Sequence, residues 1–134
     1  MAKTFRLVII TPFGRYLEGD AEFLQAHNDK YSMGITAGHS PLISTISIGK
    51  IKIRVNGQEY QYACGGGIIE VEKEKVTLIL NSIERSDEID VNRAKAAKQR
   101  AEERLENKDD DIDIARAKAS LMRAIVRIDV SENN

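Results

Sequence analysis

Apolar and polar positions alternate in short runs over the first part of the chain. Residues 5–9 and 51–55 each place apolar side chains at every second position, which is typical of a strand with one buried face. Asn56-Gly57 follows the second run at once. This dipeptide favours a β-hairpin because both central positions of a type I′ turn need positive φ. Short strands with frequent turns therefore predict an antiparallel sandwich or barrel over residues 1–85.

The pattern changes near Ser86. From there to Val130 the chain has no glycine, proline or aromatic residue, and Ala, Arg, Lys and Glu dominate. Asp90 is a suitable N-cap for a helix that runs to about Glu106. Its apolar positions recur every three or four residues, as a helix with one apolar face requires; they are Val91, Ala94, Ala97, Ala101 and Leu105.

A second helix is expected after the acidic run 109–111, because carboxylates suit the positive end of a helix. Its expected apolar stripe consists of Ile114, Ala117, Leu121, Ile125 and Ile128, widened by Ala115, Met122 and Val126. Two helices joined by a short link predict an antiparallel hairpin. The sequence thus predicts an α+β fold, with an N-terminal antiparallel β-sandwich (1–85) and a C-terminal antiparallel α-helical hairpin (86–134).

The contact between the two helices is expected to be weak. Alanines at 94, 97 and 101 allow a close approach of the backbones, but such small side chains bury little area, at about 25 cal/mol per Å². A segment held this weakly belongs to the low-stability part of a structure, where switching elements are found. We therefore expect the hairpin to be a regulatory element.

Charge and composition exclude several classes of function. Among 134 residues the chain has 20 basic and 21 acidic side chains, so it lacks the basic excess of a nucleic-acid or anionic-membrane binder. Cys64 is the only cysteine and, within an apolar stretch, is interpreted as a buried apolar residue. We find no signal peptide and no apolar run of about 18 residues, so we expect a soluble, intracellular protein without membrane insertion.

No catalytic or metal-binding constellation is present in the sequence. The two histidines and one cysteine lack metal-ligand spacing, and neither a Walker motif nor a nucleophile elbow occurs. Residues 65–67 are three glycines that precede a predicted strand and not a helix. A corner between strands is therefore favoured over a phosphate-binding loop. We expect a non-catalytic protein that requires no metal.

Three motifs in register carry a family resemblance. They are GITAGHSPL at 34–42, GGIIEV at 66–71 and IDVNRA at 89–94. These stretches resemble the G-I-x-P-G-H-x-P-L turn, the G-G-[FI]-[LI]-E-V strand and the [IL]-D-x-x-R-A junction of the ε subunit of F-type ATP synthases. Ala37 departs from the usual proline of the turn, and Tyr31 and Ser32 stand where many bacterial members carry an acidic residue that faces the rotor ring.

The resemblance implies a role in the central stalk of a proton-translocating ATP synthase. The family's sandwich docks on the γ subunit and the c-ring, and so couples rotation to ATP synthesis. Its hairpin can extend along γ into the catalytic α/β hexamer and inhibit ATP hydrolysis. The resemblance further implies a peripheral location at the cytoplasmic face of a bacterial plasma membrane; a plastid origin is the less favoured alternative.

Four arginines of the predicted hairpin form pairs that share a helix face. Arg93 and Arg100 are seven residues apart, and Arg123 and Arg127 are four apart. Guanidinium groups suit phosphate, so several together offer a polyphosphate site without a glycine-rich loop. From spacing alone, a solvated face with local ion pairs is the favoured interpretation.

The resemblance shifts this balance towards ATP as a regulatory ligand. Bacillus-type members of the family bind ATP on the folded hairpin, and every matching position is present here: Glu84, Ile89, Asp90, Arg93, Ala94, Arg100, Arg123 and Arg127. By resemblance, Asp90 caps the helix and accepts a hydrogen bond from the adenine amino group or the ribose. Ile89 and Ala94 contact the base, the arginines hold the phosphates, and Glu84 orients an arginine or the sugar.

Two alternatives stay open. One is the same stalk subunit without significant nucleotide binding, and the other is a free-standing ATP sensor. A sandwich-type carbohydrate or nucleic-acid binder is disfavoured, because the chain has no tryptophan, few aromatic residues and no basic stripe.

Overall fold

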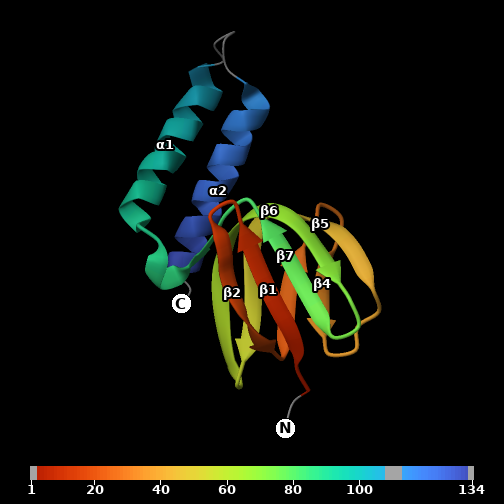
Figure 1. Ribbon diagram of the computed structural model, residues 1–134. Helices are drawn as coiled ribbons and strands as arrows, with labels where there is room; N and C mark the ends of the chain where they lie inside the picture. The colour runs from red at the N-terminus through yellow and green to blue at the C-terminus, as the bar shows by residue number, and fades with distance from the viewer. Residues whose placement is uncertain (1–2, 108–112, 133–134) are drawn as a thin grey trace.

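A computed structural model describes residues 3–107 and 113–132 of the chain. Strands make up the first part and two helices the second, as the sequence predicts (Figure 1). The elements, in chain order, are β1 (Phe5–Thr11), β2 (Gly14–Ala21), β3 (Phe23–His27), β4 (Ser32–Thr36), β5 (Leu42–Val55), β6 (Gln58–Val71), β7 (Lys75–Leu80), β8 (Ile83–Arg85), the 3₁₀ turn η1 (Ser86–Glu88), α1 (Val91–Asn107) and α2 (Ile114–Glu132).

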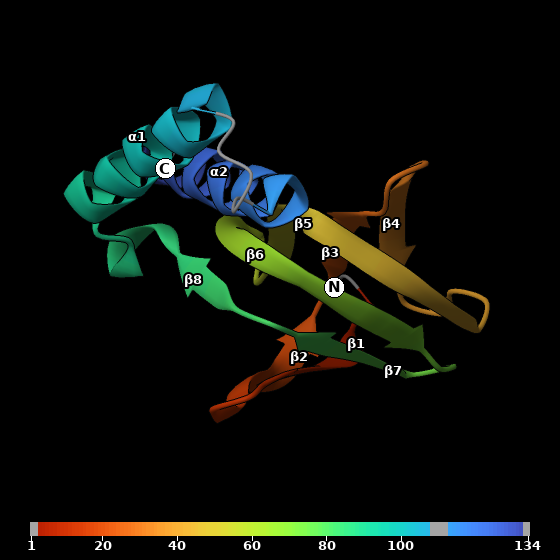
Figure 2. The ribbon, with the colours of Figure 1, turned by 90° about the horizontal axis from the view of Figure 1, so that it is seen from above.

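The strands form one continuous sheet that folds into two layers (Figure 2). Its order is β2-β1-β7-β6-β5-β3-β4, with β8 also paired to β6. The long β5–β6 hairpin belongs to both layers, because residues 67–71 of β6 pair with β7 while residues 52–54 of β5 pair with β3. The predicted sandwich is confirmed, with one addition: β1 and β7 run parallel, whereas all other pairs are antiparallel.

The predicted turn and the predicted glycine corner both lie in this long hairpin. Asn56 and Gly57 have φ of 51° and 78°, as a type I′ turn requires. Gly65 and Gly67 lie inside β6, where an added Cβ would lie 2.2 Å from Ser82 Oγ and 2.0 Å from Ile79 O, respectively. The expected corner between strands is thus wrong in form, because the three glycines lie inside one continuous strand. Gly65 and Gly67 allow neighbouring segments to approach β6 closely.

The hydrophobic core lies between the two layers of the sheet. The strands contribute the inward side of each alternating run, and the fully buried side chains include Leu7, Ile9, Leu24, Ile69 and Leu78. Ile51 and Ile53 of the second predicted run are also buried. The alternation seen in the sequence thus marks the core face of the strands correctly.

Both helices begin at an aspartate. Asp90 Oδ1 accepts a hydrogen bond from the backbone N–H of Arg93 at 3.1 Å, so the predicted N-cap of α1 is confirmed. Asp113 does the same for α2, accepting from the backbone N–H of Arg116 at 3.1 Å. The acidic run 109–111 expected before α2 lies outside the described residues.

The helices pair through small side chains, but the expected stripe of α2 is partly wrong. Ala94 and Ala101 are the buried residues of α1. In α2 the buried residues are Ala117, Ala124, Val126 and Val130, whereas Ile114, Met122 and Ile125 are about half exposed. The reason is that α2 contacts both α1 and the sandwich, so its buried residues are not those of a helix that covers one partner alone.

The hairpin rests on the sandwich through the C-terminal part of α2 (Figures 1 and 2). Val126 and Val130 pack against Ala63 of β6, with Ile48 and Ile89 at the margin. An ion pair joins Lys50 to Asp129 at 3.3 Å. These contacts, with the Arg127–Glu84 ion pair between α2 and β8, join the hairpin to the sandwich. That the hairpin is weakly held stays a prediction. None of the helices in the described residues is long and apolar enough to cross a membrane.

Candidate functional site

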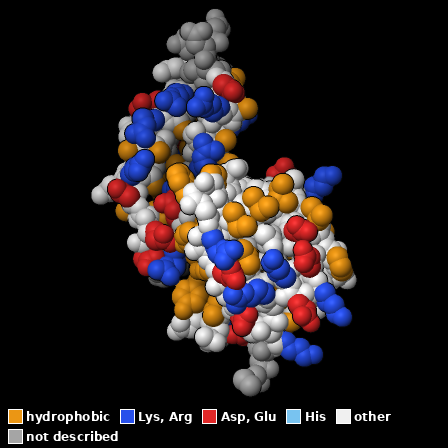
Figure 3. Space-filling view, in the orientation of Figure 1, with side chains coloured by type: hydrophobic (Ala, Val, Ile, Leu, Met, Phe, Trp, Pro, Cys, Tyr) orange, Lys and Arg blue, Asp and Glu red, His pale blue; other side chains and the backbone are white. Residues whose placement is uncertain are grey.

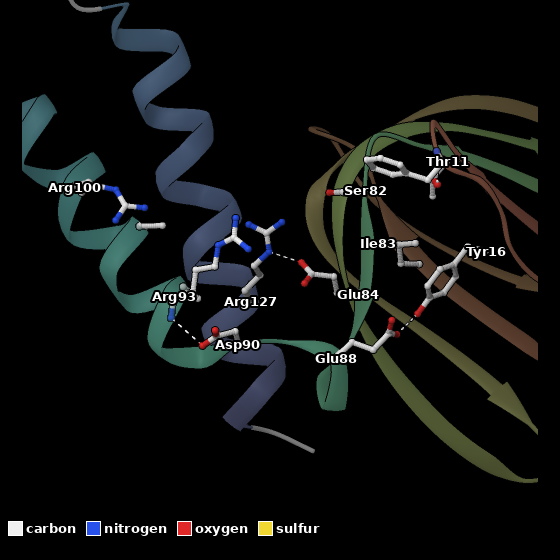
Figure 4. A pocket seen from close by; sticks show the side chains of 13 residues that line it. Thr11, Tyr16, Ser82, Ile83, Glu84, Glu88, Asp90, Arg93, Arg100 and Arg127 are labelled. Carbon is white, nitrogen blue, oxygen red and sulfur yellow. Dashed lines mark hydrogen bonds and ion pairs between the residues drawn. The ribbon is translucent and has the colours of Figure 1, made fainter.

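A cleft of about 620 Å³ separates the helical hairpin from one end of the sandwich (Figure 4). One wall comes from α1 and α2, and the other from the β1–β2 turn and the segment that follows β7. Its lining residues are Thr11, Phe13, Tyr16, Ser82, Ile83, Glu84, Glu88, Asp90, Arg93, Ala94, Ala97, Arg100 and Arg127.

Three arginines line the hairpin side of the cleft. Arg93 and Arg100 project from α1, and Arg127 from α2 (Figure 4). Arg127 forms a hydrogen-bonded ion pair with Glu84 of β8. Within residues 3–107 and 113–132, the Arg93 and Arg100 guanidinium groups have no ion-pair partner. The cleft therefore holds two cations that are available to an anionic ligand.

Three carboxylates also line the cleft, and each already accepts hydrogen bonds. Glu84 accepts from Arg127, and Asp90 Oδ1 accepts from the Arg93 backbone N–H. Glu88 Oε1 accepts from the Tyr16 hydroxyl and, at 3.1 Å, from the Arg85 backbone N–H. Only Glu84 is paired with a guanidinium group, whereas Glu88 and Asp90 accept from neutral donors and keep their negative charge. The three arginines and three carboxylates of the lining therefore balance in formal charge.

The root of the hairpin is fixed to the sandwich beside the cleft. Burial, together with the hydrogen bond to Glu88, raises the pKa of Tyr16 well above its usual value, so this phenol stays protonated and donates. Its ring meets Tyr62 edge-on, with the centroids 6.3 Å apart. Two hydrogen bonds from Arg85 to Asp87, at 2.7 and 2.9 Å, hold the pKa of the Asp87 carboxyl below its usual value. These contacts position η1 immediately before α1.

Six of the eight predicted site residues line this cleft: Glu84, Asp90, Arg93, Ala94, Arg100 and Arg127. The other two lie elsewhere. Ile89 packs at the margin of the apolar contact between α2 and the sandwich. Arg123 donates to Ser120 Oγ at 3.1 Å and is not among the lining residues. The roles assigned to all eight in ligand binding stay predictions.

Residues from the start of the chain complete the cleft, and sequence reasoning missed them. Thr11, Phe13 and Tyr16 lie more than sixty residues before Asp90 in the sequence, yet they line the same space. Among these three residues, only Phe13 could have indicated a binding role from sequence. An aromatic side chain at the tip of a tight turn cannot be buried in the core of the sandwich. In the described part of the chain, no group of His, Cys, Asp and Glu is arranged to hold a metal ion.

Family models match nearly the whole chain. The β-sandwich domain of the ATP synthase delta/epsilon chain matches residues 4–86, and the long α-helix domain of the same chain matches residues 87–132. This chain belongs to the ATP synthase delta/epsilon chain family. The resemblance inferred from three short motifs is thereby confirmed over both parts of the fold.

Members of this family from several bacteria are similar in sequence. The ATP synthase epsilon chain of Desulfitobacterium hafniense (strain Y51) is 42% identical over 109 residues, which cover 81% of this chain and 83% of that one. That of Bacillus pumilus is 40% identical over 77% of this chain and 79% of that one. That of Bacillus cytotoxicus is 40% identical over 96% of this chain and 97% of that one.

Two solved structures share the fold at low sequence identity. A chain of the Euglena gracilis mitochondrial ATP synthase (OSCP/F1/c-ring) superposes with a TM-score of 0.72 at 17% identity, over 96% of this chain and 78% of that one. A chain of the Tetrahymena thermophila mitochondrial ATP synthase central stalk and c-ring gives a TM-score of 0.61 at 16% identity, over 98% of this chain and 96% of that one.

Proposed function

We propose that this chain is a non-catalytic central-stalk subunit of a bacterial F-type ATP synthase, regulated by ATP. Its sandwich docks on the γ subunit and the c-ring at the cytoplasmic face of the plasma membrane, and so helps couple proton-driven rotation to ATP synthesis. The observation that carries the proposal is the family match across both sandwich and hairpin. Two solved chains of similar fold come from mitochondrial ATP synthase assemblies, one of OSCP, F1 and the c-ring and one of the central stalk and c-ring, which supports the choice of partners.

An exposed apolar surface on the sandwich supports docking to another protein. Ile43 of β5 is 73% exposed, and Ile68 and Ile79, which pair across β6 and β7, are about half exposed. Hydrophobic side chains gather on this face of the sandwich in Figure 3. Contiguous exposed apolar side chains mark interaction surfaces, and we assign this one to γ.

The hairpin is proposed to inhibit ATP hydrolysis when it extends into the α/β hexamer. Its docked form depends on Val126, Val130 and Ala63, a small apolar contact. A ligand that binds only the docked form shifts the equilibrium towards it. Moving the population from 1:99 to 99:1 needs about 5.5 kcal/mol of differential binding. Charge-assisted hydrogen bonds contribute roughly 1.5–3 kcal/mol each, so a few phosphate contacts suffice.

ATP is the proposed ligand of the cleft. Arg93 and Arg100 bind phosphate oxygens, and Arg127 joins them while Glu84 orients its guanidinium group. Asp90 accepts from the adenine amino group or the ribose, and Ala94 contacts the base. Two residues need a local change to take part: Arg123 must rotate from Ser120, and Ile89 must turn from the apolar contact. Support comes from the two cations without ion-pair partners in the described residues.

Isothermal calorimetry of the isolated chain with ATP tests nucleotide binding. We expect saturable heat, with one ATP bound per chain. No heat at millimolar ATP would leave the stalk role without nucleotide regulation. Co-purification with a γ-type coiled-coil subunit tests the stalk role separately, and a chain that binds ATP yet never co-purifies with γ would be a free-standing ATP sensor.

A further inference from the structure

Phe13 is almost completely exposed at the edge of the candidate cleft. Its exposed fraction is 99%, whereas the next most exposed large hydrophobic side chain in the described residues, Ile43, is 73% exposed. A phenylalanine ring gains free energy when it leaves water. A solvent-exposed aromatic ring that lines a cleft can contact a ligand bound in that cleft.

The turn that carries Phe13 is well defined. Thr11 and Gly14 face each other at the ends of β1 and β2, so Pro12 and Phe13 alone form the connection. Thr11 Oγ1 accepts from the Phe13 backbone N–H at 3.2 Å and donates to Gly14 O at 3.3 Å. Gly14 has φ of 112°, which favours glycine there. The backbone below the ring is thus ordered before any ligand binds, which lowers the entropic cost of a contact.

The two walls of the cleft differ in chemistry. The hairpin wall carries the guanidinium groups and, from α1, the small side chains of Ala94 and Ala97. The sandwich wall carries Phe13 and Tyr16 of the β1–β2 region, and Figure 4 shows Tyr16 and Thr11 across the cleft from Arg93 and Arg100. A ligand that satisfies both walls has a polyanionic part and a flat aromatic part. That combination describes a nucleotide.

We infer that Phe13 stacks on the base of the bound nucleotide and forms the sandwich-side wall of the base-binding site. The inference rests on the nucleotide binding proposed above and adds to it the residue on the sandwich that holds the base. Stacking on an aromatic ring tolerates any base because every base has a π-face. Phe13 therefore contributes affinity for nucleotides as a class, whereas preference for adenine comes from hydrogen bonds to the base edge.

This contact makes the nucleotide a bridge between the two parts of the fold. The phosphates lie on arginines of the hairpin, and the base lies on a ring of the sandwich. Both contacts exist together only while the hairpin is docked. Phe13 thus increases the difference in ATP affinity between the docked and extended forms, which is the quantity that drives the switch.

A fluorescence experiment tests the position of the base. The chain has no tryptophan, so Phe13→Trp introduces a single indole at the proposed stacking position. We expect ATP to quench its fluorescence, while inorganic tripolyphosphate, which has no base, leaves it unchanged. The matched control is Tyr31→Trp, because Tyr31 is also exposed but does not line the cleft. Either of two results overturns the inference. One is equal quenching of Tyr31→Trp by ATP, and the other is unchanged fluorescence of Phe13→Trp while ATP is bound.

Calorimetry of Phe13→Ala measures the contribution of the ring. Base–aromatic stacking predicts a loss of ATP affinity of roughly tenfold, a similar loss for GTP, unchanged tripolyphosphate affinity, and recovery in Phe13→Tyr. Two results overturn the inference but leave the proposed function intact. One is an unchanged ATP affinity in Phe13→Ala, and the other is a loss of tripolyphosphate affinity as large as the loss of ATP affinity. A wild-type chain that binds no ATP removes this inference together with the proposed nucleotide regulation, and leaves the proposed stalk role. Because Phe13 packs in no core, the variant is expected to fold normally.

Discussion

At the residue scale, the arginines of the hairpin are distinguished by their partners. Arg127 is bound to Glu84, whereas Arg93 and Arg100 have no ion-pair partner in the described residues. Removing an arginine that already forms an ion pair leaves a carboxylate without its partner. The measured change then combines the loss of a ligand contact with the loss of the ion pair. Arg93 allows a cleaner test, because its side chain has no such role in the ligand-free protein.

Arg93→Ala is expected to weaken ATP binding by a factor of about ten to a hundred, from the loss of one or two charge-assisted phosphate contacts. The thermal unfolding midpoint should stay within a few degrees of wild type. Arg104→Ala is the matched control, since Arg104 lies on the same helix but outside the cleft. Calorimetric titration compares the ATP affinities of the two variants. Equal affinities would show that Arg93 does not contact the phosphates.

Cys64 illustrates how burial controls chemistry at a single residue. Its side chain is buried in the sandwich core, and burial raises the pKa of the thiol to about 11. The folded state therefore favours the protonated thiol. This contribution to stability is complete below the pKa of the unfolded thiol, near 8.5, and is lost as the pH rises through the folded value.

Two measurements check this behaviour. At pH 8 a disulfide reagent such as DTNB should react slowly with the native chain and rapidly once denaturant unfolds it, because the thiolate is the nucleophile. The urea midpoint of wild type should fall between pH 8 and about pH 10.5, and fall less in Cys64→Ala. Rapid native labelling, or the same pH dependence in both proteins, would show that burial does not protect the thiol.

At the element scale, the hairpin shows which features local sequence determines. The N-cap at Asp90 is predictable from sequence because capping depends on residues within one turn. The buried face of α2 was predicted only in part, because Val126 and Val130 face strands that are distant in the sequence. Helical period shows which residues share a face, but it does not show which of two partners that face meets.

Val130→Ala is expected to loosen the docked hairpin without unfolding the sandwich. Val130 is fully buried in the small contact with Ala63, and its truncation should cost roughly 2 kcal/mol of docking free energy. Amides of α2 should then exchange with solvent at least tenfold faster, while those of the sandwich core keep their protection. Ile125→Ala is the control, because Ile125 is partly exposed on the same helix. Equal exchange in both variants would contradict the assigned contact.

At the scale of the whole molecule, the order of the two parts followed from the change of period near Ser86. The alternating runs identified strands and the glycine-free segment identified helices, because both depend on local spacing. The parallel pairing of β1 with β7 did not follow, since those strands are far apart in the sequence. The same holds for the sandwich wall of the cleft: Phe13 and Tyr16 meet the hairpin only through tertiary folding.

The proposed switch depends on contacts from both parts of the fold. Arginines on the hairpin and an aromatic ring on the sandwich line one cleft, and a small apolar contact holds the two parts together. A ligand that spans the cleft adds its binding free energy to this weak docking. We therefore expect ATP to stabilise the docked hairpin much more than it stabilises the sandwich.

Hydrogen–deuterium exchange of the isolated chain with and without saturating ATP tests this claim most directly. We expect amides of α1 and α2 to exchange at least tenfold more slowly with ATP, while core amides of β5 and β6 change little, and we expect Arg93→Ala to abolish the effect at the same ATP concentration. Unchanged exchange in both helices, under conditions where calorimetry shows ATP bound, would contradict the proposal that ATP holds the hairpin in its docked form.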